Sequence, residues 1–205
     1  MLMTENTDII TKKPAIHIVG LGCPEFQIAA YMEHRPDMPG MAELAQLQPA
    51  ISGEIHCIGQ ACGNGWRKVF NVYAKLLYAL DPTYFDYATS ADSWQRFRDQ
   101  FLLQAGSQTA LLFSPPVLDL NRVPSRYHII MGRTYAKKLI HQGLLNAPLT
   151  WLDHEFAVNQ EHRLVVCPYF DYRQLSNLKI ERLAAILAGF AQTKSASYQS
   201  KNLTQ

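Results

Sequence analysis

The segment YHIIMGRTYAKKL, residues 127–139, changes its pattern at a single glycine. Before Gly132, the run Tyr127–Met131 is short, apolar and rich in residues typical of β-strands. After it, Thr134–His141 has the spacing of a helix, which Gly143 would end. A strand that passes through one glycine into a helix is typical of a fold in which strands and helices alternate. We therefore expect an α/β fold.

Similar runs recur along the chain. The predicted strands are Ala15–Val19, Ile55–Ile58, Thr109–Phe113 and Arg163–Cys167, with Leu149–Leu152 as a weaker candidate. The predicted helices are Trp66–Leu80 after an Asn64 cap, a helix from about Ser90 to Phe101, Leu178–Phe190 after Ser176 or Asn177, and a possible short helix over Met41–Leu47. Continuous apolar strands suit a sheet that is covered on both faces. The pattern predicts a three-layer α/β/α fold with a mostly parallel central sheet.

The 205 residues predict one domain between two tails. We expect a flexible tail over residues 1–14, a single α/β domain over 15–192 and a second flexible tail over 193–205. The start is polar and no apolar run reaches about 18 residues, which predicts a cytoplasmic protein without a membrane partner. The four cysteines are expected to be free thiols. Because their spacing lacks a C-x2-C pair, we expect no metal and no cofactor.

The net charge of +2 gives no global basic field that would attract nucleic acid. One local basic cluster could contact phosphates, and it consists of Arg122, Arg126, Arg133, Lys137 and Lys138. The alternative is that these side chains form an ordinary solvated face.

Ligands of open α/β sheets bind beyond the carboxyl ends of the strands, so the loops there carry the candidate sites. In GLGCPEF, residues 20–26, Gly20 and Gly22 would allow a ligand to approach backbone N–H groups. Glu25 stands where a dinucleotide-binding fingerprint needs its third glycine, so that reading is weak. A plain strand-to-helix turn is the alternative.

The segment GQACGNGW, residues 59–66, leads into the strongest predicted helix. Free N–H groups near Gly63 and Asn64 could hold an anion. Cys62 could be a reactive thiolate near a helix start, or a buried and inert thiol. It resembles the cysteine of a papain-type hydrolase, but Gly65 occupies the position before Trp66 where that nucleophile would stand.

The segment PYFDYRQLSN, residues 168–177, has three aromatic residues and an arginine. These side chains, Tyr169, Phe170, Tyr172 and Arg173, could stack on bases or separate base steps. Alternatively, Tyr169 and Phe170 cap the core while Arg173 pairs with Asp171. The candidate titrating groups are Asp171, Asp153, His154 and Glu155.

The order of these segments resembles the uracil-DNA glycosylase superfamily, from Ala15 to Phe190. The similar segments are IVGLGCP at 18–24, the glycine-rich start of the helix at 59–80, IIMGRTYAKKL at 129–139, and the strand, loop and last helix from Leu164 to Phe190. The family's loop after the last strand has a His-Pro-Ser-like motif, whereas residues 168–177 contain no histidine. The first loop also lacks the usual Asp or Asn.

The resemblance implies a DNA or nucleobase-containing ligand and a glycosylase activity that is atypical or lost. It implies that Phe26 stacks on the base, that Gly20, Gly22 and Cys23 grip its edge, and that Gly132 and Arg133 touch a phosphate. Glu25, which would orient a water, and Asp171 are the candidate catalytic residues. Tyr169, Phe170, Tyr172, Arg173 and Asn177 would contact the nucleic acid. The alternative function is an enzyme that acts on a small nucleotide or sugar phosphate held at Gly59–Gly65.

Overall fold

The computed structural model describes residues 17–118 and 126–202, with side chains up to residue 192. Its strands form one sheet in the order β3-β1-β4-β2-β5-β8-β7-β6. They are β1 Gly20–Gly22, β2 Ile28–Tyr31, β3 Leu47–Gln48, β4 Thr109–Leu112, β5 Tyr127–Met131, β6 Thr150–Trp151, β7 Ala157–Asn159 and β8 Leu164–Cys167. The α/β class is therefore confirmed.

The sheet is mixed, because it is parallel only in part. Its four central strands, β4, β2, β5 and β8, run parallel to one another. β1 joins β4 antiparallel on one side, and β7 joins both β8 and β6 antiparallel on the other. The predicted parallel arrangement thus holds for the four central strands, whereas β1, β7 and β6 join the sheet through antiparallel pairs.

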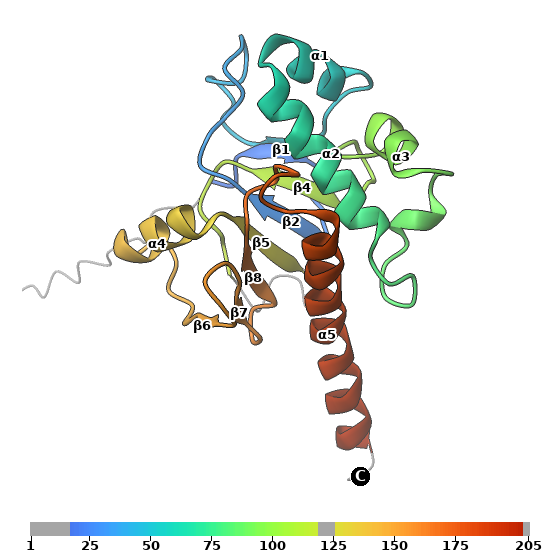
Figure 1. Ribbon diagram of the computed structural model, residues 1–205, viewed down its shortest axis with the longest axis vertical. Coiled ribbons are helices and arrows are strands. Elements are labelled where there is room, and N and C mark those ends of the chain that lie inside the picture. Colours follow the sequence, from blue (N-terminus) through green and yellow to red (C-terminus); the bar gives the residue numbers. More distant parts are fainter. Residues whose placement is uncertain (1–16, 119–125, 203–205) are drawn as a thin grey trace, which may run out of the picture.

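The helices are α1 Glu54–Ala61, α2 Asn64–Tyr78, α3 Trp94–Gln100, α4 Arg133–His141 and α5 Asn177–Asn202, with a short 3₁₀ helix at Tyr87–Thr89. Figure 1 shows α2 and α5 crossing the sheet, with α4 set apart from them. Successive residues of β2 contribute to different cores, as expected of a strand. Ala30 packs with residues of α2 and α5, whereas Ala29 and Tyr31 pack with residues of α4. The sheet is therefore covered on both faces.

Two predicted elements at the N-terminal half are wrong. Ile55–Ile58 lies in α1 instead of a strand, because Ile55 and Ile58 are three positions apart and both point into the core. Met41–Leu47 is not helical; the Arg35 guanidinium holds that segment by donating hydrogen bonds to carbonyl oxygens of Met41, Ala42 and Leu44. Both segments are too short for an apolar pattern to decide between structures.

The strand predicted at Ala15–Val19 is also misplaced. Residues 15 and 16 lie outside the described part, residues 17–19 are not in a strand, and β1 begins at Gly20. The remaining predicted strands, Thr109–Phe113, Tyr127–Met131, Arg163–Cys167 and Leu149–Leu152, correspond to β4, β5, β8 and β6. Helix caps shift by a few residues: Gly63 precedes α2, and the Ser93 side chain caps α3.

The structure describes the backbone of most of the predicted C-terminal tail. α5 continues to Asn202, so it runs through most of residues 193–205, which were predicted as a tail. Residues 1–14 lie outside the described part. Over the described ranges, no helix combines the length and apolar character needed to cross a membrane.

Candidate functional site

The close packing of β1 against β4 explains why positions 20 and 22 are glycines. A Cβ on Gly20 would lie 2.3 Å from the Leu111 carbonyl oxygen, and one on Gly22 would lie 2.3 Å from the Thr109 carbonyl oxygen. Gly22 also has a φ of 139°, a backbone conformation that residues with a side chain rarely adopt. The glycines expected in a ligand-binding loop thus lie inside a strand, where they let two strands approach closely.

The turn from Cys23 to Phe26 lies at the amino ends of the central strands. The Cys23 N–H donates to the Thr109 carbonyl at the start of β4, and Phe26 comes two residues before β2. Gly132 follows the carboxyl end of β5. Since β5 has five residues, these edges are about 16 Å apart. The predicted site is therefore divided between opposite edges of the sheet.

Phe26 and Glu25 differ in exposure, and neither faces the loops after β5 and β8. Phe26 is buried, and the Arg126 guanidinium covers its ring at 4.1 Å from the centroid. Glu25 is exposed, and its carboxylate accepts a hydrogen bond from the Cys23 thiol at 3.3 Å. A ring covered by its own protein cannot stack on a base, so the role expected for Phe26 is not supported.

The glycine-rich segment at 59–66 is shorter as a loop than predicted. Gly59 lies in α1, and only residues 62 and 63 separate α1 from α2. Gly63 has a φ of 81° and precedes α2, while Asn64 is its first residue and is exposed. The Cys62 thiol donates to the Asp37 carbonyl at 3.6 Å. All four cysteines are free.

The loop after β8 contains one core residue and one ion-pair network. Phe170 is fully buried and packs against Tyr73, with 5.6 Å between ring centroids. The Asp171 carboxylate accepts from Lys68 of α2 at 2.8 Å and from Arg173 at 3.2 Å. The aromatic residue at 170 thus supports the core, which was the alternative interpretation, and Arg173 does pair with Asp171.

Burial and these partners act oppositely on the Asp171 carboxyl. Desolvation alone would raise its pKa, but hydrogen bonds from Arg173 and Lys68 hold the pKa well below its ordinary value. Tyr172 is 58% exposed, and the Lys68 ammonium lies 4.9 Å from its ring centroid. Asn177 starts α5 and is exposed. A carboxylate already occupied by two cations is a structural group rather than an available base.

A pocket of about 470 Å³ lies where β2, β5 and β8 end. Its lining comes from the loop after β2, the Gly132 turn and first turn of α4, the β6–β7 turn and the loop after β8. The lining residues are Glu33, His34, Met131, Gly132, Arg133, Thr134, Tyr135, His154, Glu155, Pro168, Tyr169 and Gln174. Of the predicted site residues, the pocket brings together Gly132, Arg133 and Tyr169, together with the candidate titrating groups His154 and Glu155. This makes it the candidate functional site.

The first turn of α4 gives the pocket its N–H donors. The first N–H groups of a helix have no partner within it, and those of α4 follow Gly132. The Gly132 φ of 95° allows the turn, and its N–H donates to the Cys167 carbonyl at 2.8 Å, which joins the ends of β5 and β8. The Arg133 guanidinium donates to the His154 carbonyl at 3.2 Å and lies 5.5 Å from the centroid of the Trp151 ring.

Two carboxylates and two phenols complete the pocket. Glu33 forms an ion pair with Lys138 of α4, whose hydrogen bond lowers the pKa of that carboxyl. Burial raises the pKa of Tyr135 to about 12, and the nearby Glu33 charge adds to the effect. Burial likewise raises the pKa of Tyr169. The pocket thus has an ionised Glu33 carboxylate and neutral Tyr135 and Tyr169 hydroxyl groups at neutral pH.

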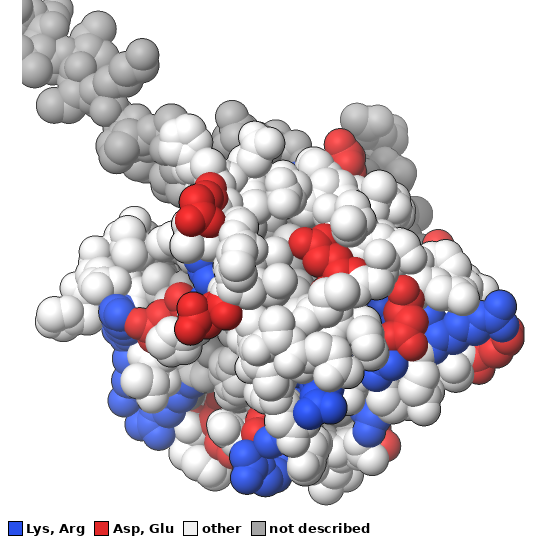
Figure 2. Space-filling model, turned by 90° about the horizontal axis from the view of Figure 1, so that it is seen from above, with Lys and Arg blue, Asp and Glu red and all other residues white. Residues whose placement is uncertain are grey.

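The sequence interpretation missed Glu33, His34 and Gln174. The signal for the first two was present, since an apolar run at 28–32 precedes them, but its two alanines do not indicate a strand. In the described ranges, no group of three His, Cys, Asp or Glu side chains could hold a metal. Seen from the side of α1, the surface carries basic and acidic side chains next to each other (Figure 2), in keeping with the small net charge.

Comparison with protein families matches residues 19–188 to a family of unknown function. The chain belongs to the DUF6942 family. The matched range includes the central strands and every residue that lines the pocket, so the candidate site is part of the region that defines membership of DUF6942. Comparisons with curated proteins and with solved structures find no match.

Proposed function

We propose that this protein binds a nucleobase, free or within DNA, in the pocket at the carboxyl ends of β2, β5 and β8. The observation that carries the proposal is the convergence of three strand ends and the α4 N-terminus on one pocket of about 470 Å³. Pockets at this edge are where open α/β sheets bind ligands. The proposal includes a three-layer fold like that of the uracil-DNA glycosylase superfamily.

The lining chemistry supports a planar polar ligand. A base edge presents both donors and acceptors, and the pocket is lined by both kinds of group. Gln174 and the α4 N–H groups can donate, while Glu33, which is paired with Lys138, and Glu155, which is paired with Lys179, can accept. The half-buried Tyr169 ring offers a face for stacking. The charge of Arg133 is available to a phosphate, because this side chain forms no ion pair with any described residue.

In this proposal Glu33 takes the place of Glu25 beside the ligand. Both follow an early strand of the sheet, but only the loop after β2 reaches the pocket. The ion pair with Lys138 lowers the pKa of Glu33, and a carboxylate with a lower pKa is a weaker base for activating water. Together with the absence of a histidine from residues 168–177, this favours binding with weak or lost glycosylase activity.

The second candidate function, an enzyme for a small nucleotide or sugar phosphate held at Gly59–Gly65, has less support. Gly59 to Ala61 form the last turn of α1 and are not available as a phosphate-binding loop. The candidate remains a prediction for Gly63 and Asn64 at the start of α2.

The test is a fluorescence anisotropy titration with labelled DNA, single-stranded and duplex, with and without uracil, at two salt concentrations. Arg133→Gln should weaken binding about tenfold, because it removes a charged contact, and it should flatten the salt dependence. Arg96→Gln is the matched control: Arg96 is an exposed arginine of α3, ion-paired with Asp92. Equal affinities in the two variants would contradict the role of Arg133, and no binding of any DNA or of free uracil at low salt would contradict the proposal.

Base release in the same samples separates binding from catalysis. If any release is measured, Glu33→Gln should abolish it and Glu25→Gln should leave it unchanged, because these glutamates lie at opposite edges of the sheet. Release that depends on Glu25 instead would show that the pocket is not the reacting site.

A further inference from the structure

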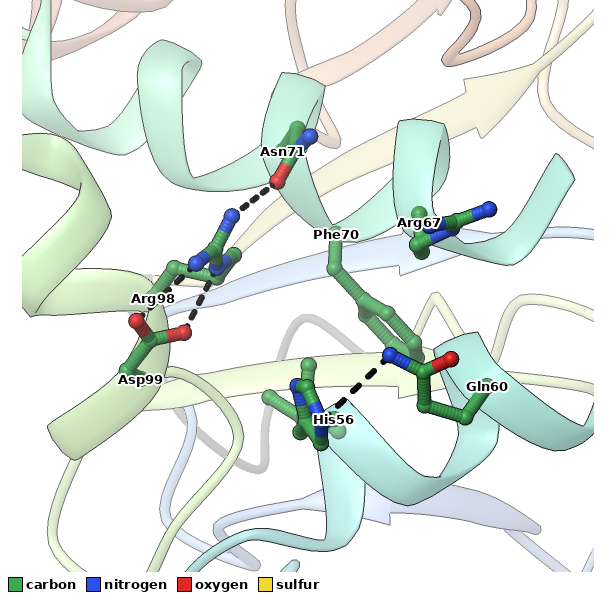
Figure 3. A pocket seen from close by; sticks show the side chains of 8 residues that line it. His56, Gln60, Arg67, Phe70, Asn71, Arg98 and Asp99 are labelled. Atoms are coloured by element: carbon green, nitrogen blue, oxygen red, sulfur yellow. Dashed lines mark hydrogen bonds and ion pairs between the residues drawn. The ribbon is translucent and has the colours of Figure 1, made fainter. Parts of the chain in front are cut away.

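A second pocket, of about 190 Å³, lies between α1, α2 and α3 (Figure 3). Its lining residues are Ile55, His56, Gln60, Arg67, Phe70, Asn71, Arg98 and Asp99. None of them lines the pocket at the strand ends. With two arginines and one aspartate, the lining carries a net charge of +1 when His56 is neutral. The two cations come from different helices and lie on either side of Phe70.

Arg67 is the cation available to a ligand in this pocket. It forms no hydrogen bond or ion pair with any described residue, and it is exposed. Its side chain crosses α1 at Gly59, where an added Cβ would lie 2.7 Å from the Arg67 Cγ. A side chain larger than hydrogen at 59 would push the arginine away, so the glycine leaves room for the arginine stem. The guanidinium is thus placed at the pocket with its charge unpaired.

Arg98 lies on the opposite side of the pocket from Arg67 and holds two neighbouring side chains. Its guanidinium donates to the Asp99 carboxylate at 2.7 and 2.9 Å, and to the Asn71 Oδ1 at 2.5 Å (Figure 3). Because the Asn71 oxygen accepts from Arg98, its amide nitrogen is left to donate elsewhere. On α1, the Gln60 Nε2 lies 3.5 Å from the His56 Nε2. The pocket therefore offers several N–H donors around a single unpaired positive charge.

The volume and the apolar lining of the pocket limit which ligands it can hold. Its volume of about 190 Å³ is less than half of the 470 Å³ of the pocket at the strand ends, which favours a compact ligand. Ile55 and Phe70 form the apolar part of the lining, and both are buried. A guanidinium with neighbouring amide donors matches the geometry of a phosphate or carboxylate group.

We propose that this pocket is a binding site for a compact oxyanion, either phosphate or a small carboxylate, held by Arg67 and the Asn71 amide. The site is independent of the nucleobase pocket, because the two share no residue. It would let the concentration of a small anionic metabolite stabilise the packing of α1 against α2 and α3.

Isothermal titration calorimetry with sodium phosphate, and separately with sodium succinate, at constant ionic strength tests the site. Binding of either anion is expected, and Arg67→Gln should weaken it about tenfold through loss of the charged hydrogen bonds. Two controls have an arginine changed elsewhere: Arg96→Gln on the outer side of α3 and Arg133→Gln in the nucleobase pocket. Both should bind like the wild type. Arg67 is exposed, so thermal melting of Arg67→Gln should match that of the ligand-free wild type.

Three results would overturn the proposal. Neither anion binds at millimolar concentration; or Arg67→Gln binds as tightly as the wild type; or Arg133→Gln loses as much affinity as Arg67→Gln, which would place the anion at α4. The two anions also distinguish the two classes of ligand. Binding of phosphate alone assigns the site to phosphate and its esters, and binding of succinate alone assigns it to carboxylates.

Discussion

The Lys68–Asp171 ion pair ties α2 to the loop after β8, and Lys68→Met tests what it contributes. The two charged atoms are 2.8 Å apart, and the side chains are only 11% and 14% exposed. Methionine keeps an unbranched apolar stem but removes the charge. In the variant, Asp171 keeps Arg173 as its ion-pair partner, and that side chain is 71% exposed.

The expected loss of stability follows from leaving a mostly buried carboxylate with half of its partners. Removal of one partner from a buried pair costs about 3–5 kcal/mol. Because Arg173 still donates at 3.2 Å, we expect the lower end, about 3 kcal/mol. With a urea m-value of about 2 kcal/mol/M, the unfolding midpoint would fall by roughly 1.5 M.

The pH dependence has a defined sign. Although desolvation opposes it, the hydrogen bonds from Arg173 and Lys68 lower the pKa of Asp171 in the folded state. Its stabilising effect is therefore complete above the ordinary carboxyl pKa of about 3.9 and is lost as pH falls through the lower folded pKa. The difference in stability between Lys68→Met and the wild type should thus be full at pH 7 and shrink below about pH 4.

Urea unfolding followed by far-ultraviolet circular dichroism, at pH 7 and at about pH 3.5, measures both effects. Arg96→Met is the matched control, since it breaks an exposed pair worth at most about 1 kcal/mol. The double variant Lys68→Met with Asp171→Asn should recover part of the loss, because no unpaired charge is then buried. A loss no larger than that of the control, or one independent of pH, would refute the reasoning.

Three further predictions rest on single residues. Phe170→Ala should cost about 3–5 kcal/mol in urea unfolding, whereas Tyr172→Ala at an exposed position should change stability by about 0.5 kcal/mol or less; similar losses would contradict the buried position of Phe170. Backbone N–H groups lower the pKa of Asp153 to about 2, so Asp153→Asn should be less stable than the wild type at pH 7, with a difference that fades as pH falls from about 4 towards 2; a constant difference would exclude the carboxylate as its source. Gly22→Ala should unfold at lower temperature than the wild type because a Cβ would meet a carbonyl oxygen at 2.3 Å, whereas Gly65→Ala, in open space within α2, should gain up to about 1 kcal/mol; equal melting temperatures would contradict this contrast.

The sequence predicted well those elements whose pattern is long or has a clear boundary. α2 has apolar residues at helical spacing over four turns, and β5 ends at a glycine that the turn requires. Short segments failed where composition opposes the structure. β2 contains Ala29 and Ala30, which favour helices, yet it lies between β4 and β5 because small side chains fit where both faces are covered. Only packing across the sheet determines such a strand.

The predicted site residues are divided between two edges of the sheet for a topological reason, which is the direction of one strand. β1 is antiparallel to β4, so the turn that contains Glu25 lies at the amino ends of the central strands. The first strand that runs parallel to β5 and β8 is β2, and the residue that its end carries to the pocket is Glu33. Local sequence records that a glycine-rich turn is present but not which way its strand runs in the sheet. Pairing with β4, about 90 residues later, sets that direction, and with it which glutamate can reach a ligand.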